Sequence, residues 1–97
     1  MAILNPIIHQ PVRLRIMAVM VAFPMETQVT FNYLKETLGL TDGNLSVHLH
    51  KLEETGYLRI SKTFVCNKPQ TYIENTEAGK QAFEEHRSAL KEILESR

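Results

Sequence analysis

The clearest hydrophobic pattern in the chain lies between residues 39 and 58. Leu45, Leu49 and Leu52 recur there at i, i+4 and i+7, and at about 100° per residue these three side chains share one stripe of a helix. The pattern therefore predicts a helix that turns its leucines towards the core. The opposite arc and its flanks carry small, polar or basic residues, namely Gly43, Asn44, Ser46, Val47, His48, His50 and Lys51.

The residues at its two ends set the bounds of this helix at 42–55. Thr41 occupies the N-cap position, where its hydroxyl can accept from a free backbone N–H of the first turn. Asp42 follows at the positive end of the helix dipole, and Gly56 permits the left-handed conformation that commonly ends a helix.

A second short helix is predicted just upstream, over residues 31–38. Phe31, Leu34 and Leu38 form its apolar stripe, with a threonine before it as cap and a glycine after it as stop. Two short helices joined by a glycine-containing turn of about three or four residues are typical of the helix-turn-helix motif, in which the second helix enters the major groove of DNA. The polar arc of the 42–55 helix is the surface that such a contact would use.

Longer helices are predicted at both ends of the chain. The first spans 10–22, because Pro11 suits a first turn and VRLRIMAVMVA is largely apolar. The last spans 77–95, with Thr76 as its cap and apolar residues that continue to its far end. Because those residues would face water in a monomer, we expect self-association. The residues expected at the dimer interface are Ile3, Ile7, Ile8, Met17, Phe83, Leu90, Ile93 and Leu94.

The period changes from about 3.6 to 2 after the 42–55 helix. Residues 57–64 alternate in part and are rich in β-branched and aromatic side chains, which favours a strand. Residues 65–69 are predicted to form a hairpin tip, and residues 70–74 return as the second strand. The sequence thus predicts a two-stranded wing over 57–74, and Val29 is expected to add a short strand.

Length and composition are ordinary for one globular domain over residues 1–97. The chain is 43% apolar and 23% charged. Its longest apolar run, residues 16–23, is far shorter than the about 20 residues that cross a bilayer. With no secretory signal pattern at the start, a cytoplasmic location and no membrane partner are expected. The single cysteine, Cys66, cannot form an internal disulfide.

The net charge of zero, from 11 Lys plus Arg and 11 Asp plus Glu, argues against nucleic acid as a partner, because most DNA-binding domains are basic. Affinity for the phosphate backbone depends, however, on how charge is arranged. Between residues 55 and 70 the only charges are Arg59, Lys62 and Lys68, all positive. We therefore expect weak non-specific binding, which a dimer with two basic edges would strengthen.

Catalytic and metal chemistry find little support. His48 and His50, at i and i+2, diverge by about 200° on a helix and cannot share an ion. His9 and His86, whose segments we expect to meet at the dimer interface, lack a cysteine or acidic partner at ligand spacing. The chain carries no glycine-rich phosphate loop or nucleophile motif. The sequence predicts neither an enzyme nor a cofactor.

The order of helices and hairpin, with LSVHLHKLEETGYL in its middle, resembles the winged helix-turn-helix regulators of the MarR and ArsR type. The resemblance covers nearly the whole chain and is closest to small stand-alone winged-helix DNA-binding proteins. Two separated segments carry it, LTDGNLSVHLHKLEETGY at 40–57 and PQTYIENTEAG at 69–79. It implies an α+β, mostly helical fold with a two-stranded β wing and a long C-terminal dimerisation helix.

The function that this resemblance implies is a dimeric, sequence-specific regulator of transcription bound to double-stranded DNA. The 42–55 helix would enter the major groove and the wing would follow the backbone. Asn44 suits a paired hydrogen bond to adenine and Val47 a thymine methyl, whereas lysines suit phosphates. The implied DNA-binding residues are Thr41, Gly43, Asn44, Ser46, Val47, His50, Lys51, Arg59, Lys62 and Lys68.

A second interpretation stays open beside the first. Winged helices also serve as protein-interaction or dimerisation modules without DNA binding, and the neutral charge suits that role. The sequence does not identify a small-molecule effector.

Overall fold

The computed structural model describes residues 2–96, and within them the elements follow in the predicted order. This order and the alternation of helix and sheet confirm a winged-helix fold of the α+β class. The elements are α1 (Pro11–Val21), β1 (Val29–Thr30), α2 (Phe31–Leu38), α3 (Asp42–Glu54), β2 (Leu58–Val65), β3 (Lys68–Asn75) and α4 (Glu77–Glu95).

The predicted caps delimit the helices. Thr30, Thr41 and Thr76 each accept, through the side-chain hydroxyl, a hydrogen bond from the backbone N–H three residues later. Gly39 and Gly56 adopt left-handed conformations with φ of 66° and 88°, so α2 and α3 end where the glycines predict. The helix predicted over 42–55 is shorter by one residue than expected, because residue 55 is its C-cap.

The sheet has three strands, in the order β1-β3-β2, and all pairs are antiparallel. The predicted two-stranded wing is confirmed as the hairpin of β2 and β3. The short strand that Val29 was expected to add pairs with β3 at Ile73 and anchors the base of the hairpin to the helices. Beyond that pairing, β2 and β3 continue alone as the wing.

The hairpin tip is tighter than the sequence predicted. Only Cys66 and Asn67 lie outside the strands, and both have positive φ, 52° and 63°. Two consecutive positive φ values make a type I′ turn, whose twist matches that of the flanking strands. The expected five-residue tip at 65–69 was therefore wrong, because Val65 pairs with Lys68 and the ladder continues up to the turn.

The hydrophobic core lies where α1, α2 and α3 meet the inner end of the sheet. The three leucines of α3 are all buried, as predicted. Ile8 and Met17 are fully buried in the same core. They have no surface to offer a partner, which corrects their assignment to a dimer interface. The core side chains that are almost fully enclosed are Ile8, Ile16, Met17, Met20, Leu34, Leu45, Leu49, Leu52, Leu58 and Ile73.

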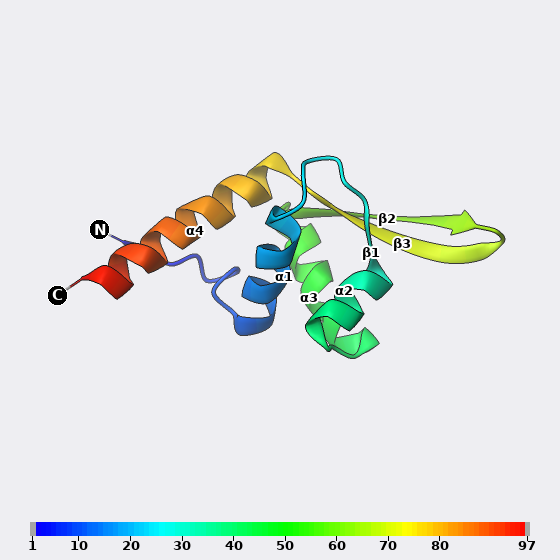
Figure 1. Ribbon diagram of the computed structural model, residues 1–97, viewed down its shortest axis with the longest axis horizontal. Coiled ribbons are helices and arrows are strands. Elements are labelled where there is room, and N and C mark those ends of the chain that lie inside the picture. The colour runs from blue at the N-terminus through cyan, green and yellow to red at the C-terminus, as the bar shows by residue number, and fades with distance from the viewer. Residues whose placement is uncertain (1, 97) are drawn as a thin grey trace.

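The molecule is elongated, with principal extents of 56 × 25 × 21 Å. Figure 1 shows the wing projecting from one end of the helical body, while α4 and the N-terminal segment run together towards the other end. The two chain ends lie near each other there, far from the wing. Each helix within residues 2–96 is too short or too polar to span a bilayer.

A polar contact holds α3 against α1. The Arg13 side chain donates from Nε to the carbonyl oxygen of Ile7, at 2.6 Å, and its Nη1 lies 3.2 Å from Nδ1 of His48 on α3. A guanidinium can only donate, so Nδ1 of His48 accepts and the ring is neutral. Burial, and then the charge of Arg13, lower the pKa of His48 from its ordinary value. His48 thus lies at the edge of the helix packing and is bonded to a neighbouring helix.

A second histidine contact fastens the N-terminal segment to α4. The backbone N–H of Asn5 donates to Nδ1 of the buried His86 at 3.0 Å, and Nε2 of His86 lies 3.2 Å from Nδ1 of His9. Because Nδ1 of His86 accepts, its proton sits on Nε2, which donates to His9. The two histidines thus meet within one protomer, so this contact needs no second copy of the chain. Burial and the neighbouring His9 lower the pKa of His86.

The first prediction concerns the contact between α4 and the start of the sheet. A Cβ added at Gly79 would fall on the backbone carbonyl of Tyr57, so Gly79→Ala should lower the free energy of unfolding by about 1–3 kcal/mol or more. The control is Gly43→Ala, where an added Cβ meets nothing within 4 Å. The higher helix propensity of alanine there should raise the free energy of unfolding by up to about 1 kcal/mol. Urea denaturation measures both, and equal effects of the two variants would contradict the packing described.

The second prediction follows from the lowered pKa of His48 and of His86. The folded protein holds both rings neutral, whereas the unfolded chain binds a proton near pH 6.5. The free energy of unfolding should therefore be highest above pH 6.5 and fall below it, by at most about 1.4 kcal/mol per pH unit for each ring.

The slope, rather than the absolute stability, tests this linkage, because substitution at a buried site changes stability at every pH. Denaturation is measured between pH 7.5 and pH 5.5, and the lower end of this range is at about the upper limit of carboxyl titration. Over this range the free energy of unfolding should change less steeply with pH for His86→Gln and for His48→Gln than for the parent. Identical slopes in all three proteins would contradict neutral rings in the folded state.

Candidate nucleic-acid interface

The face of α3 opposite its leucines is open to solvent. Val47 lies at the centre of this face and its side chain is 66% exposed. At about 100° per residue, Ser46 and His50 lie to one side of Val47, and Asn44 and Lys51 lie to the other. All ten residues that the sequence proposed for DNA contact are exposed in the protomer.

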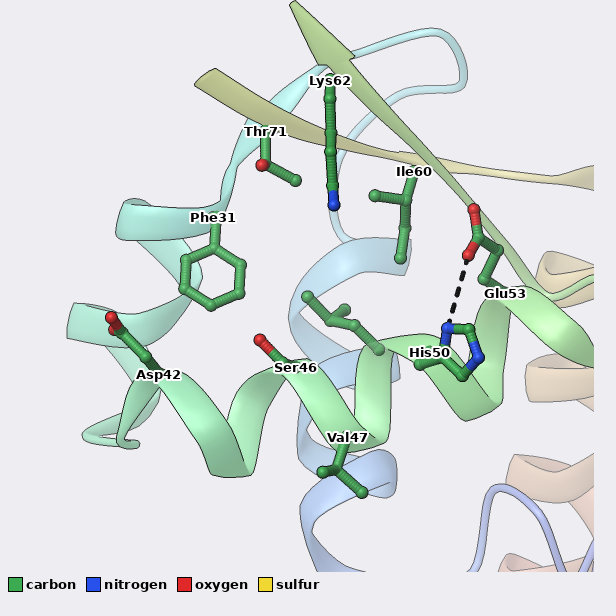
Figure 2. Close-up of a pocket in the computed structure, with 10 residues that line it drawn as sticks. Phe31, Asp42, Ser46, Val47, His50, Glu53, Ile60, Lys62 and Thr71 are labelled. Carbon is green, nitrogen blue, oxygen red and sulfur yellow. Dashed lines mark ion pairs between the residues drawn. The ribbon is translucent and has the colours of Figure 1, made fainter. Parts of the chain in front are cut away.

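An open groove of about 620 Å³ separates α3 from the wing. Figure 2 shows Lys62 pointing from its strand towards α3, with the ring of Phe31 from the start of α2 beside it. Ser46, Val47 and His50 line the helix side of the same groove. The complete lining consists of Phe31, Asp42, Ser46, Val47, Leu49, His50, Glu53, Ile60, Lys62 and Thr71.

The hairpin register divides the three wing cations between two faces. Side chains alternate along a strand, and directly paired residues share a face. Lys62, paired with Thr71, therefore lies on the groove face. Arg59 and Lys68 fall on the opposite face, where Arg59 is 3.6 Å from Glu74. The structure thus places only one of the three cations beside the candidate helix.

The two ends of α3 differ in charge. At the C-terminal end, Glu53 and Glu54 lie 3.9 Å from the ring nitrogens of His50, and Glu54 also lies 3.8 Å from Nζ of Lys51. At the other end Asp42 is paired with Lys35 at 2.7 Å. Exposed pairs of this kind contribute at most about 1 kcal/mol each. The carboxylates at the C-terminal end oppose phosphate, so the positive, N-terminal half of the helix is the better site for a DNA contact.

The arginines of α1 are engaged elsewhere. Arg13 bonds the carbonyl of Ile7 and approaches His48, and Arg15 donates from Nη2 to the carbonyl oxygen of Leu38 at 2.8 Å. Arg15 thereby satisfies a free carbonyl at the end of α2. Both arginines orient the helix-turn-helix pair from behind.

The residues expected at a dimer interface lie in two environments. Ile3, Ile93 and Leu94 are exposed at the end of the molecule far from the wing, and Ile7, Phe83 and Leu90 are half-buried. Ile8 and Met17 are enclosed in the core. Within residues 2–96, no group of three His, Cys, Asp or Glu side chains is placed to hold a metal ion.

Three further residues shape this groove, although the sequence predicts no contact role for them. Phe31 belongs to the predicted apolar stripe of α2, and Ile60 and Thr71 belong to the predicted strands, yet all three line the groove. Period-2 alternation from Lys62 would have placed Ile60 on the same face. The role of Phe31 depends on how α2 meets the sheet, which no local pattern encodes.

Comparison with known proteins identifies the family. Residues 12–94 match the family described as the winged helix DNA-binding domain. An uncharacterized protein of Methanocaldococcus jannaschii is 39% identical over 89 residues, which cover 92% of this chain and 90% of that protein.

Solved structures agree with this match. A structure described as a transcriptional regulator homologue from Pyrococcus horikoshii has a TM-score of 0.81 and 31% identity, covering 91% of this chain and 84% of the other. A PadR family transcriptional regulator from Eggerthella lenta has a TM-score of 0.62, covering 86% of this chain and 83% of its own. HlyU from Vibrio cholerae has a TM-score of 0.58, covering 94% and 86%. The last two, at 19% identity, show the fold alone.

These matches and the open face of α3 lead to one conclusion: the chain belongs to the winged-helix DNA-binding domain family, a class of non-enzymatic regulators of transcription.

Proposed function

We propose that the protein binds double-stranded DNA in a sequence-specific manner, with the N-terminal half of α3 in the major groove and the wing along the neighbouring backbone. The observation that carries this proposal is the exposed face of α3, centred on Val47, beside the inward-pointing Lys62. The leucines behind that face are buried, so the helix is held rigidly. Docking of a rigid helix requires no rearrangement of the protomer.

The side chains fit distinct parts of the DNA. Val47 offers an apolar surface for a thymine methyl, and the side-chain amide of Asn44 can make two hydrogen bonds to the major-groove edge of adenine, accepting from N6 and donating to N7. Lys62 makes no ion pair with any residue in the 2–96 range, so its charge is available to a phosphate. Lys51 and Lys68 supply further phosphate contacts from the outer sides of helix and wing.

The proposed regulator is a homodimer of the MarR or ArsR type. Ile93 and Leu94 are exposed near the end of α4 opposite the wing, and Leu90, one turn earlier, extends this apolar surface along the helix, whereas the exposed Ile3 borders α4 on the side that carries Glu85 and Glu92. A two-fold dimer through this surface presents two α3 helices to two half-sites of DNA. The same proposal places the protein in the cytoplasm, where a bacterial or archaeal regulator meets chromosomal DNA.

Zero net charge and the carboxylates at the end of α3 favour a second candidate, a protein-interaction module of the same fold. The two functions differ in their response to salt. DNA binding through phosphates weakens steeply as salt rises, and a random duplex titrated from low to high salt distinguishes them. Absence of binding at low salt would support the interaction module.

The third prediction assigns roles within the DNA-binding face. Lys62→Ala should weaken binding to all sequences alike and reduce the salt slope by about 1, because it removes one phosphate contact. Asn44→Ala should relax the preference at one base position, by about 1–3 kcal/mol. Binding of selected genomic fragments measures both, with the exposed Lys80→Ala on α4 as the charge-matched control. Equal loss on every sequence for Asn44→Ala would refute its role in recognition.

The fourth prediction tests the dimer. Sedimentation should show a dimer at micromolar concentration, and Leu94→Glu should convert it to a folded monomer, because this side chain is 74% exposed in the protomer. Val47→Glu introduces the same charge at an exposed apolar site on α3 and should leave the dimer intact. A parent protein that sediments as a monomer would refute this part of the proposal.

A further inference from the structure

The end of the wing carries three exposed apolar side chains that the fold does not use. Phe64 is 73% exposed and Val65 is 46% exposed, although both lie in β2. Pro69, on the neighbouring strand, is exposed as well. None of the three packs against the hydrophobic core. A large aromatic side chain that is exposed to water at a projecting tip, beside other exposed apolar residues, indicates an interaction site.

The register places Phe64 on the same face as the groove. Phe64 pairs directly with Pro69, so the two side chains lie beside each other on one face. Two residues earlier on the same strand is Lys62, which lines the groove next to α3. Val65 points to the opposite face. The chain therefore forms a continuous surface from the exposed face of α3, through Lys62, to the apolar pair at the tip.

The shape and edge of the tip limit what can bind there. The two-residue turn leaves only Cys66 and Asn67 beyond the last strand pair, so the tip is narrow. β1 pairs with β3 only at residues 72 and 73, so Pro69 lies at an open edge of the sheet. A proline has no N–H for an added strand and protects an edge from pairing. A second β-strand is therefore a poor occupant.

Charge identifies the kind of partner. Every charged residue from position 55 to position 73 is a cation, namely Arg59, Lys62 or Lys68. An apolar side chain flanked by cations suits an anionic partner that has an apolar crevice. The minor groove of DNA has this combination, since apolar side chains enter it and separate neighbouring base steps while lysines contact the phosphates on its rims.

We propose that Phe64, supported by Pro69, is an apolar wedge that enters the minor groove beside the major-groove segment occupied by α3. It partly unstacks one base step and so bends the DNA towards the major groove. This inference rests on the proposed DNA-binding function and adds a residue that acts through DNA shape. Flexible pyrimidine–purine steps at that position are then preferred, because they cost the least to unstack.

The test measures bending and affinity together. A duplex of about 30 base pairs, selected for binding and labelled at both ends, reports bending by energy transfer. Phe64→Ala should bind roughly tenfold more weakly and lose the bend at saturation. Phe64→Leu should keep the bend, because a leucine also serves as a wedge. Val65→Ala, an exposed apolar residue on the other face of the same hairpin, is the matched control and should stay within about twofold of the parent.

Each outcome decides one point. If the parent binds without bending, or if Phe64→Ala bends DNA as the parent does, the wedge is refuted while the proposed function stands. Equal losses in Phe64→Ala and Val65→Ala also refute it, because the effect then belongs to the hairpin as a whole. Absence of DNA binding by the parent refutes the proposed function itself. Thermal melting of Phe64→Ala should match the parent, since this side chain is exposed.

Discussion

Burial of the leucine stripe of α3 fixes how this helix is oriented in the domain. Leu45, Leu49 and Leu52 are at most 2% exposed, and full burial of such a side chain is worth roughly 1.5–3 kcal/mol. Rotation of α3 by a quarter turn would bring a polar side chain into the core, which is costly. The same packing that stabilises the domain therefore fixes which face of the helix remains outside, and function follows from what stands on that face.

The wing obeys a similar constraint through its turn. Cys66 and Asn67 both adopt left-handed conformations, which fixes a two-residue loop and with it the pairing of β2 and β3. A slip of one residue would exchange the two faces. Lys62 and Phe64 would then leave the side of α3. The positions of these two residues thus depend on a turn that contains neither of them. At the other end of the hairpin, pairing with β1 holds its base at a fixed angle to the helices.

Much of this architecture could be predicted from the sequence, because capping and periodicity are local. The threonine caps, the glycine stops and the leucine stripe each depend on a few neighbouring residues, and the structure confirms them. The failures involve contacts between distant segments. Ile8 and Met17 look like interface residues until the N-terminal segment is seen to fold over α1 and α4, tied by the bond from Asn5 to His86. The separation of Lys62 from Arg59 and Lys68 likewise required the register.

In the proposed complex, DNA meets one continuous surface that runs from the exposed face of α3 to the groove side of the wing. Backbone amide shifts, recorded by NMR during titration with a duplex, locate this surface residue by residue. The largest changes should fall at residues 41–51 and 60–71, and the far end of α4 should be unchanged apart from effects of assembly. Changes concentrated on α4 and the N-terminal segment, with α3 unaffected, would contradict the proposed complex.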